Sequence, residues 1–117
     1  MKEKFVPYDP AEALTSDAAV EVFMNDAFET GNTGYIVHAI GVAARAKGMS
    51  KIADETGLAR EALYRSFSEE GNPSLKSTIA VLKSLGLVLS VRSLAVVEAE
   101  RQKMTGDNED TASEAAE

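Results

Sequence analysis

The side chains most suited to chemistry in this sequence lie close together, between Ser50 and Arg65. Arginine can hold guanine through a pair of hydrogen bonds, and glutamate can accept a hydrogen bond from cytosine, when a helix presents them to the major groove of DNA. Here Arg60, Glu61, Tyr64 and Arg65 would share the outer face of one short helix. Their types and spacing therefore predict a helix that contacts base edges.

Such a helix has to be held by a second one, and the preceding residues meet the requirements of that pairing. A small residue is needed where the helices cross, which Ala53 supplies, and the turn needs a residue that tolerates positive φ, which Gly57 supplies. Apolar contacts inward would come from Ile52, Leu58 and Leu63. This spacing favours a helix-turn-helix, and the alternative is a generic helical hairpin in a small bundle. Ala59 replaces the usual Ser or Thr cap, at a cost of about 1 kcal/mol.

The rest of the chain is predicted to be almost entirely helical. Caps, apolar residues at spacings of three and four, and terminal glycines predict helices over about 17–29, 33–47, 51–56, 60–67 and 72–85. Ser50 is expected to cap the third helix, and Asn72, followed by Pro73, the fifth. The side chains expected to point inward from the fifth helix are Leu75, Ile79, Leu82 and Leu85.

After Gly86 the pattern changes, because the run 87–92 is apolar and rich in residues that favour β-structure. We predict one short strand here. A lone strand leaves backbone groups unpaired, so this one is expected to pair with a second copy across a two-fold axis. The side chains expected to form that dimer contact are Leu87, Val88, Leu89 and Val91.

A frayed helix over about 95–104 and a disordered acidic tail over 105–117, which lacks large apolar residues, are expected to complete the chain. The predicted fold class is therefore all-α, a bundle of about five helices with one short C-terminal β-strand. Three parts are expected: an acidic N-terminal helical segment (1–32), a DNA-binding domain with the dimerising strand (33–93), and the frayed helix with the acidic tail (94–117).

Charge is distributed unevenly along the chain. Across 117 residues, 19 acidic side chains outnumber 12 basic ones, for a net charge of −7, which argues against a nucleic-acid partner. Residues 1–35 hold two basic and seven acidic residues, and residues 104–117 hold five acidic and no basic residues. Residues 36–103 hold ten basic and seven acidic residues. The acidic excess therefore lies at the ends, and the expected DNA-binding helix lies in a mildly basic centre.

The composition also excludes several classes of function. The chain has no cysteine and one histidine, which excludes disulfides, thiol nucleophiles and a metal site built from several histidines. No phosphate-binding loop or carboxylate cluster is present, so we expect neither an enzyme nor a cofactor. No apolar run approaches the roughly 20 residues of a membrane helix, and residues 1–9 lack the apolar stretch of a signal peptide. We therefore expect a cytoplasmic protein without a membrane partner.

Several motifs spread over about residues 7–92 form a pattern that is more specific than the hairpin alone. They are Tyr-Asp-Pro-Ala-Glu (8–12), Ala-Ala-Arg-Ala-Lys-Gly-Met (43–49), Ile-Ala-Asp-Glu-Thr-Gly-Leu (52–58), Glu-Ala-Leu-Tyr-Arg (61–65), Gly-Asn-Pro (71–73) and Leu-Lys-Ser-Leu-Gly-Leu (82–87). Together they resemble the addiction-module antidote proteins, which are HigA-type antitoxins with a lambda-repressor-like (Xre) helix-turn-helix domain. The resemblance implies a homodimer that binds an inverted-repeat operator in its own promoter. It also implies neutralisation of a small basic RelE-like RNase toxin.

The resemblance further implies roles for individual residues. Arg60, Glu61 and Arg65 match the positions from which this family would read bases, with Tyr64 beside them. Two further groups suit phosphate oxygens: Ser50 with Lys51, and the backbone amides that follow Asn72. The alternative for the base-reading positions is a solvated helix face carrying an ion pair between Glu61 and Arg65.

Two functions remain open at this stage. One is an antitoxin that represses its own promoter, and the other is a stand-alone or phage-type transcriptional regulator without a toxin. The acidic N-terminal segment favours the antitoxin, because a surface complementary to a basic toxin would speed its association.

Overall fold

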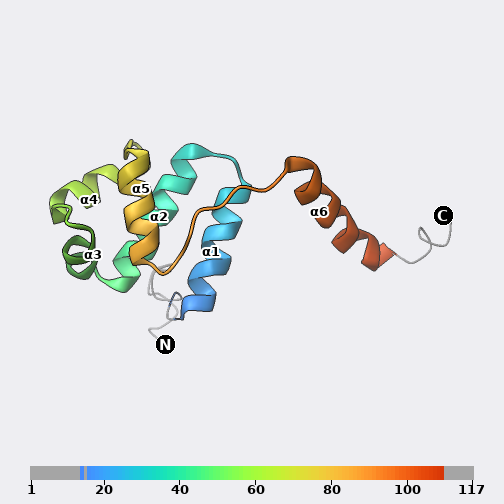
Figure 1. Cartoon of the computed structure of the whole chain (residues 1–117), viewed down its shortest axis with the longest axis horizontal. Helices are drawn as coiled ribbons and strands as arrows, with labels where there is room; N and C mark the ends of the chain where they lie inside the picture. The colour runs from blue at the N-terminus through green and yellow to red at the C-terminus, as the bar shows by residue number, and fades with distance from the viewer. Residues whose placement is uncertain (1–13, 15, 110–117) are drawn as a thin grey trace, which may run out of the picture.

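The structure is a computed structural model that describes residue 14 and residues 16–109. Its described part contains six helices and no strand (Figure 1). The helices are α1 (Asp17–Glu29), α2 (Thr33–Lys47), α3 (Met49–Thr56), α4 (Arg60–Ser66), α5 (Leu75–Ser84) and α6 (Leu94–Glu109). Part of the expected N-terminal segment, residues 1–13 and 15, lies outside the described residues, as do residues 110–117 of the expected tail. No helix of the described chain is long and apolar enough to cross a bilayer.

Local signals set the ends of the first two helices as the sequence predicts. Ser16 caps α1 by accepting a hydrogen bond from the Ala19 backbone N–H at 3.1 Å. Asn32 caps α2 in the same way, with its side-chain oxygen 2.9 Å from the Tyr35 backbone nitrogen. Gly48 follows the last residue of α2 with a φ of 116°, a value that favours glycine. Both predicted helices are confirmed.

The core surrounds α2, whose middle part is buried on most sides. α1 packs along α2, and α3 packs against α2, α4 and α5. The most deeply buried large side chains come from different helices: Ile40, Ile52, Leu63 and Val81. Each of them contributes about 1.5–3 kcal/mol of burial free energy. The bundle is therefore held together through α2, and α4 reaches the core mainly through Leu63.

Three predictions about helix starts and faces are wrong. α3 begins at Met49 after Gly48, so Ser50 lies inside its first turn and is not its cap. α5 begins at Leu75 and is capped by Ser74, which accepts a hydrogen bond from the Ser77 N–H at 3.0 Å, so Asn72 lies in the preceding loop. Leu82 and Leu85 are buried as expected, but Leu75 is 67% exposed and Ile79 is 45% exposed.

The buried face of α5 explains why Ile79 does not point inward as predicted. It passes through Val81, which is fully buried and which the sequence pattern did not single out. Positions 79 and 81 point in nearly opposite directions on a helix. Burying Val81 therefore turns Ile79 toward solvent.

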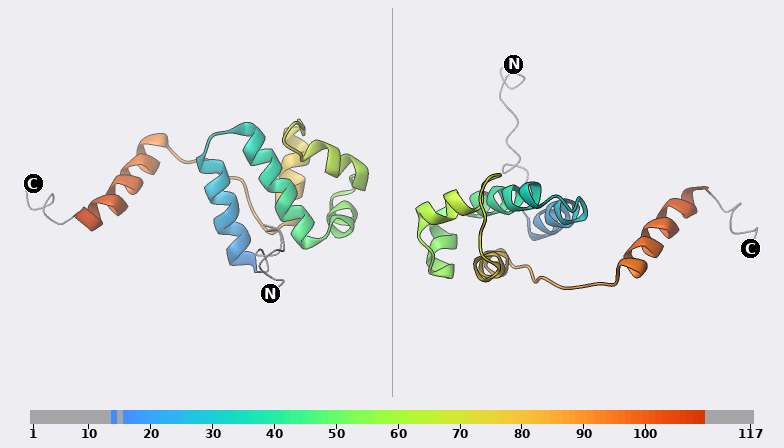
Figure 2. Two further views of the ribbon diagram at one scale, coloured as in Figure 1. Left: turned by 180° about the vertical axis from the view of Figure 1, so that it is seen from behind. Right: turned by 90° about the horizontal axis from the view of Figure 1, so that it is seen from above.

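The predicted strand is also wrong, because residues 87–93 form an extended coil. Strand pairing needs a second strand, and the described chain contains none. The coil leads into α6, which begins close to the predicted start but runs on through residues 105–109, where we expected disorder. α6 extends away from the rest of the molecule in every view (Figures 1 and 2). It shares no extensive packing with another described helix.

Candidate nucleic-acid interface

The candidate interface is built on the hairpin formed by α3, the turn at residues 57–59 and α4. Gly57 ends α3 in the left-handed conformation, with a φ of 78°. The Thr56 hydroxyl donates to the Ile52 carbonyl at 2.7 Å and accepts from the Leu58 N–H at 3.2 Å, which ties the turn to the end of α3. Gly57 therefore takes the conformation that the sequence predicts for the turn.

The start of α4 lacks a side-chain cap, as the sequence indicates. Ala59 has the extended conformation of a capping residue, with φ −68° and ψ 140°, but it has no side-chain oxygen to bind the first backbone amides. Leu63 anchors the helix in the core with an exposed fraction of 1%. One buried leucine therefore fixes which face of this short helix points outward.

The four residues of α4 predicted to contact bases are all exposed: Arg60, Glu61, Tyr64 and Arg65. The Arg60 guanidinium lies over the Tyr64 ring, 5.4 Å from its centroid, in a cation–π contact. Among the described residues no ion pair joins Glu61 to Arg65. The ion pair of the alternative interpretation is therefore absent, whereas the four side chains are exposed in either interpretation.

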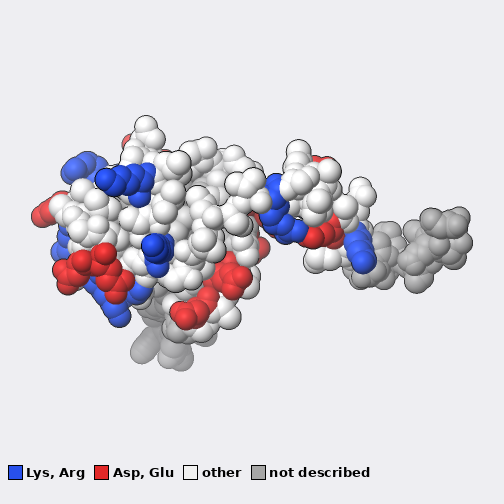
Figure 3. Space-filling model, viewed as in Figure 1, with Lys and Arg blue, Asp and Glu red and all other residues white. Residues whose placement is uncertain are grey.

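The residues predicted to contact phosphate lie on other elements and are also exposed. Ser50 and Lys51 lie in the first turn of α3, and Asn72 lies in the loop before α5. In the face shown by Figure 3, Lys and Arg side chains are frequent over the end of the molecule formed by α3, α4 and α5, with acidic side chains among them. The structure thus groups Ser50 and Lys51 with the hairpin, whereas Asn72 belongs to a separate loop.

A polar cluster that the sequence analysis missed joins this hairpin to the two longer helices. Glu55 on α3 accepts from the Ser84 hydroxyl at 2.6 Å and from the Lys47 ammonium at 3.3 Å. The Lys47 ammonium also donates to the Ser84 backbone carbonyl. The hydrogen bond from Ser84, followed by that from Lys47, lowers the pKa of Glu55 below its ordinary value. The cluster connects the ends of α2, α3 and α5.

Gly41 is a second positioning residue that the sequence analysis missed. It lies in the middle of α2, where a methyl group would come closer than 3.0 Å to the Phe67 carbonyl oxygen at the end of α4. α4 therefore approaches α2 at a point that only glycine can occupy without a shift. A glycine in the interior of a predicted helix is the signal that could have identified this position.

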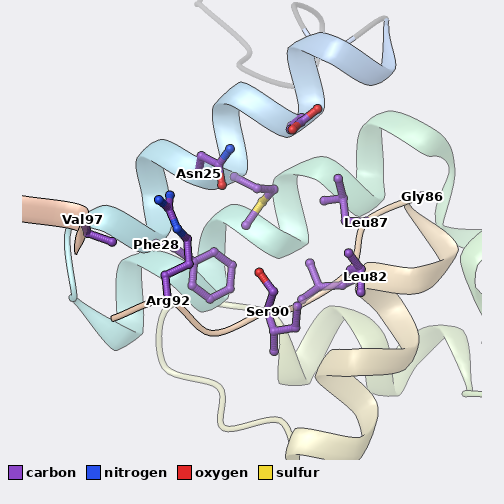
Figure 4. Close-up of a pocket in the computed structure, with 12 residues that line it drawn as sticks. Asn25, Phe28, Leu82, Gly86, Leu87, Ser90, Arg92 and Val97 are labelled. Atoms are coloured by element: carbon purple, nitrogen blue, oxygen red, sulfur yellow. The ribbon is translucent and has the colours of Figure 1, made fainter. Parts of the chain in front are cut away.

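The predicted dimer residues lie in the coil after α5. Leu87 is half-buried and Leu89 is partly exposed, whereas Val88 is 86% exposed and Val91 is 96% exposed. This coil, the end of α5 and one side of α1 enclose a groove of about 560 Å³ (Figure 4). The described chain therefore presents an apolar segment whose side chains are only partly covered.

The described part is thus a small all-helical protein with an exposed two-helix hairpin and an apolar groove, and both features are suited to binding other macromolecules. The family model described as "Probable addiction module antidote protein" matches residues 4–93. The chain belongs to this family of antidote proteins, and membership implies a cognate toxin as a partner.

The chain is also similar to an uncharacterized protein of Haemophilus influenzae, with 37% identity over 92 residues that cover 79% of this chain and 95% of the relative. The comparison with solved structures gave no match. The family match ends at residue 93, immediately before α6.

Proposed function

We propose that this protein is the antitoxin of a type II toxin–antitoxin module. In this proposal a homodimer binds an inverted-repeat operator in its own promoter through a lambda-repressor-like helix-turn-helix, and the protein also neutralises a small basic RelE-like RNase. The observation that carries the DNA-binding part is the outer face of α4, where four polar and aromatic side chains are exposed on a helix anchored by Leu63.

α4 would act as the recognition helix. Arg60 lies in its first turn, the part of a recognition helix that contacts base edges. The contact with Tyr64 restricts the Arg60 side chain before DNA binds, which reduces the entropy lost on binding. Ser50 and Lys51 would contact phosphate, and Asn72 would place the amides that follow it near the backbone.

The homodimer would form through Leu87, Val88, Leu89 and Val91. Val88 and Val91 are almost fully exposed in the single chain, so a second copy that covers them removes apolar surface from water. Two copies related by a two-fold axis would present two recognition helices, which requires half-sites about one turn of DNA apart.

The toxin would meet an acidic surface. α1 carries Asp17, Glu21, Asp26 and Glu29 and has no basic residue. A surface of one sign attracts a partner of the opposite sign over a distance of several ångströms and raises its association rate. Family membership supports this function over that of a stand-alone regulator.

The DNA-binding part is tested with Arg60→Gln and Arg65→Gln, measured by fluorescence anisotropy on a duplex from the protein's own promoter and on a random duplex. A bidentate contact with guanine is worth about 1–3 kcal/mol, so we expect roughly a 5- to 150-fold loss on the promoter duplex alone. Lys83→Gln, which changes an exposed cation on α5, is the matched control. Equal losses on both duplexes would show that the arginines contact only phosphate.

The toxin-binding part is tested separately by co-expression with the neighbouring reading frame. We expect a small basic protein to copurify, and Glu21→Gln together with Asp26→Gln should slow its association. If no such protein binds, neutralisation is refuted, whereas the promoter experiment still decides DNA binding.

A further inference from the structure

Two of the exposed side chains on α4 are in contact with each other in the chain on its own. The Arg60 guanidinium lies over the Tyr64 ring, 5.4 Å from its centroid. The two residues are four positions apart, so they lie one turn apart on the same side of the helix. Figure 1 shows α4 at the end of the molecule opposite α6, and both side chains are exposed there. The pair is therefore accessible to a ligand as a unit.

The pair offers two kinds of surface side by side. The Arg60 guanidinium is a flat fork of N–H donors, which matches the two acceptors that guanine presents in the major groove. Tyr64 is 44% exposed although the guanidinium lies over its ring, so part of this side chain is accessible for a second contact. The carbon atoms of the ring give that part an apolar surface. A ligand that satisfies both residues must present hydrogen-bond acceptors close to an apolar group.

DNA meets this requirement in one way. In the major groove each base edge presents hydrogen-bond donors or acceptors, and thymine alone adds a methyl group. A tyrosine ring beside an arginine that binds guanine therefore has the thymine methyl as its apolar partner. Successive base pairs are about 3.4 Å apart, so a separation of 5.4 Å between guanidinium and ring places that methyl within two base pairs of the guanine.

We propose that Arg60 and Tyr64 form one recognition unit, in which Arg60 binds a guanine and the Tyr64 ring contacts the methyl group of a thymine within two base pairs of it. This proposal rests on the DNA binding of the proposed function and adds the base that the tyrosine recognises. The ring orients the guanidinium, and the guanidinium fixes the position of the ring. The alternative for Tyr64 is a hydrogen bond from its hydroxyl to phosphate, which carries no sequence information.

The first test removes methyl groups from the DNA without changing its base pairing. The promoter duplex is made with deoxyuridine in place of every thymidine, and fluorescence anisotropy compares its affinity with that of the ordinary duplex. We expect the parent protein to prefer the ordinary duplex by about 4-fold for each half-site, the value of one buried methyl group. Tyr64→Ala should lose most of this preference because the ring is gone. Tyr64→Phe should keep it because the ring remains.

Tyr35→Ala is the matched control for these variants. Tyr35 on α2 is 46% exposed and lies outside the hairpin, so this change should leave the preference for the ordinary duplex intact. If the preference were lost in Tyr64→Phe as well, the hydroxyl rather than the ring would make the contact, and the proposal would be wrong.

Two further results would overturn the recognition unit. One is equal binding of the two duplexes by the parent protein, and the other is a Tyr64→Ala protein that keeps the parent's preference. Both leave the binding of promoter DNA standing. A parent protein that binds the promoter duplex no better than a random duplex would instead refute the DNA binding of the proposed function itself, so the two failures can be told apart.

The second test asks whether the two residues act together. Arg60→Gln, Tyr64→Ala and the double variant are compared on the ordinary promoter duplex. If the residues acted independently, the fold-losses of the single variants would multiply in the double variant. We expect a smaller loss, because removal of either side chain already releases the other, and Arg60→Gln should also weaken the preference for thymine over uracil. A double variant whose loss equals the product would show that Arg60 and Tyr64 do not form a unit.

Discussion

A single methyl group at Gly41 tests whether the close approach of α4 to α2 holds the hairpin in place. In Gly41→Ala the new methyl would overlap the Phe67 carbonyl oxygen and lie 3.3 Å from the carbonyl carbon. The end of α4 would have to retreat by roughly 1 Å to restore ordinary contact. Because Phe67 is buried, this retreat disturbs the core beneath the hairpin.

The expected free-energy change combines two opposing effects. Overpacking of this kind costs about 1–3 kcal/mol, whereas replacing glycine by alanine inside a helix gains about 1 kcal/mol. The new methyl group meets a backbone carbonyl, which cannot rotate away as a side chain can. We therefore expect a net decrease of about 1–2 kcal/mol in the free energy of unfolding. For a domain of this size the loss corresponds to a decrease in Tm of roughly 5–15 °C.

Gly34→Ala in the same helix is the matched control. Its methyl would lie 3.3 Å from the Glu69 carbonyl oxygen, a tight contact without the overlap found at Gly41. We expect its free energy of unfolding to stay within about 0.5 kcal/mol of the parent, since the helix-propensity gain offsets the contact. Urea unfolding followed by circular dichroism measures both variants. A Gly41→Ala protein as stable as the parent would show that α4 does not press against α2.

Three further predictions concern the cap of α4, the polar cluster and the exposed coil. Ala59→Ser supplies the missing cap and should raise the free energy of unfolding by about 1 kcal/mol in urea titrations, and an unchanged midpoint would contradict the assignment of α4. Glu55 has a lowered pKa in the folded chain, so its contribution is present at neutral pH and is lost as pH falls through that lowered value. Glu55→Gln should therefore lower Tm at about pH 7 but not at about pH 3, and an equal decrease at both would refute this role. Val91→Asp changes a side chain that is 96% exposed, so it should weaken the dimer in light scattering without changing the secondary structure. The control Val22→Asp changes an exposed valine on α1 and should leave the dimer as strong as that of the parent chain.

The predictable parts of this fold are those that local interactions determine. Ser16 and Asn32 cap their helices through contacts three residues away, so the sequence alone locates α1 and α2. Gly57 is predictable for a similar reason, because the short turn itself requires positive φ. The outer face of α4 follows from the same local geometry once Leu63 is assigned to the core.

The features that the sequence does not predict are determined by contacts between residues far apart in the chain. The sequence predicts Asn72 as the cap of the fifth helix, but the structure uses Ser74, a residue type that caps helices about as well. Residues 87–92 have the composition of a strand, but a strand has to pair with another strand, and the described chain contains none. The polar cluster joins Glu55 to a serine 29 residues away, a pairing that no local pattern contains.

An acidic chain can bind DNA as proposed only if two copies of it act together. The central part of each chain has ten basic and seven acidic residues, so one copy offers little attraction to phosphate. Two copies would double that attraction and present two recognition helices in one complex, which raises effective concentration at the second half-site. Operator affinity should therefore depend steeply on dimerisation and on salt. It follows that the coil after α5, although it is not part of the hairpin, would control how tightly the hairpin holds DNA.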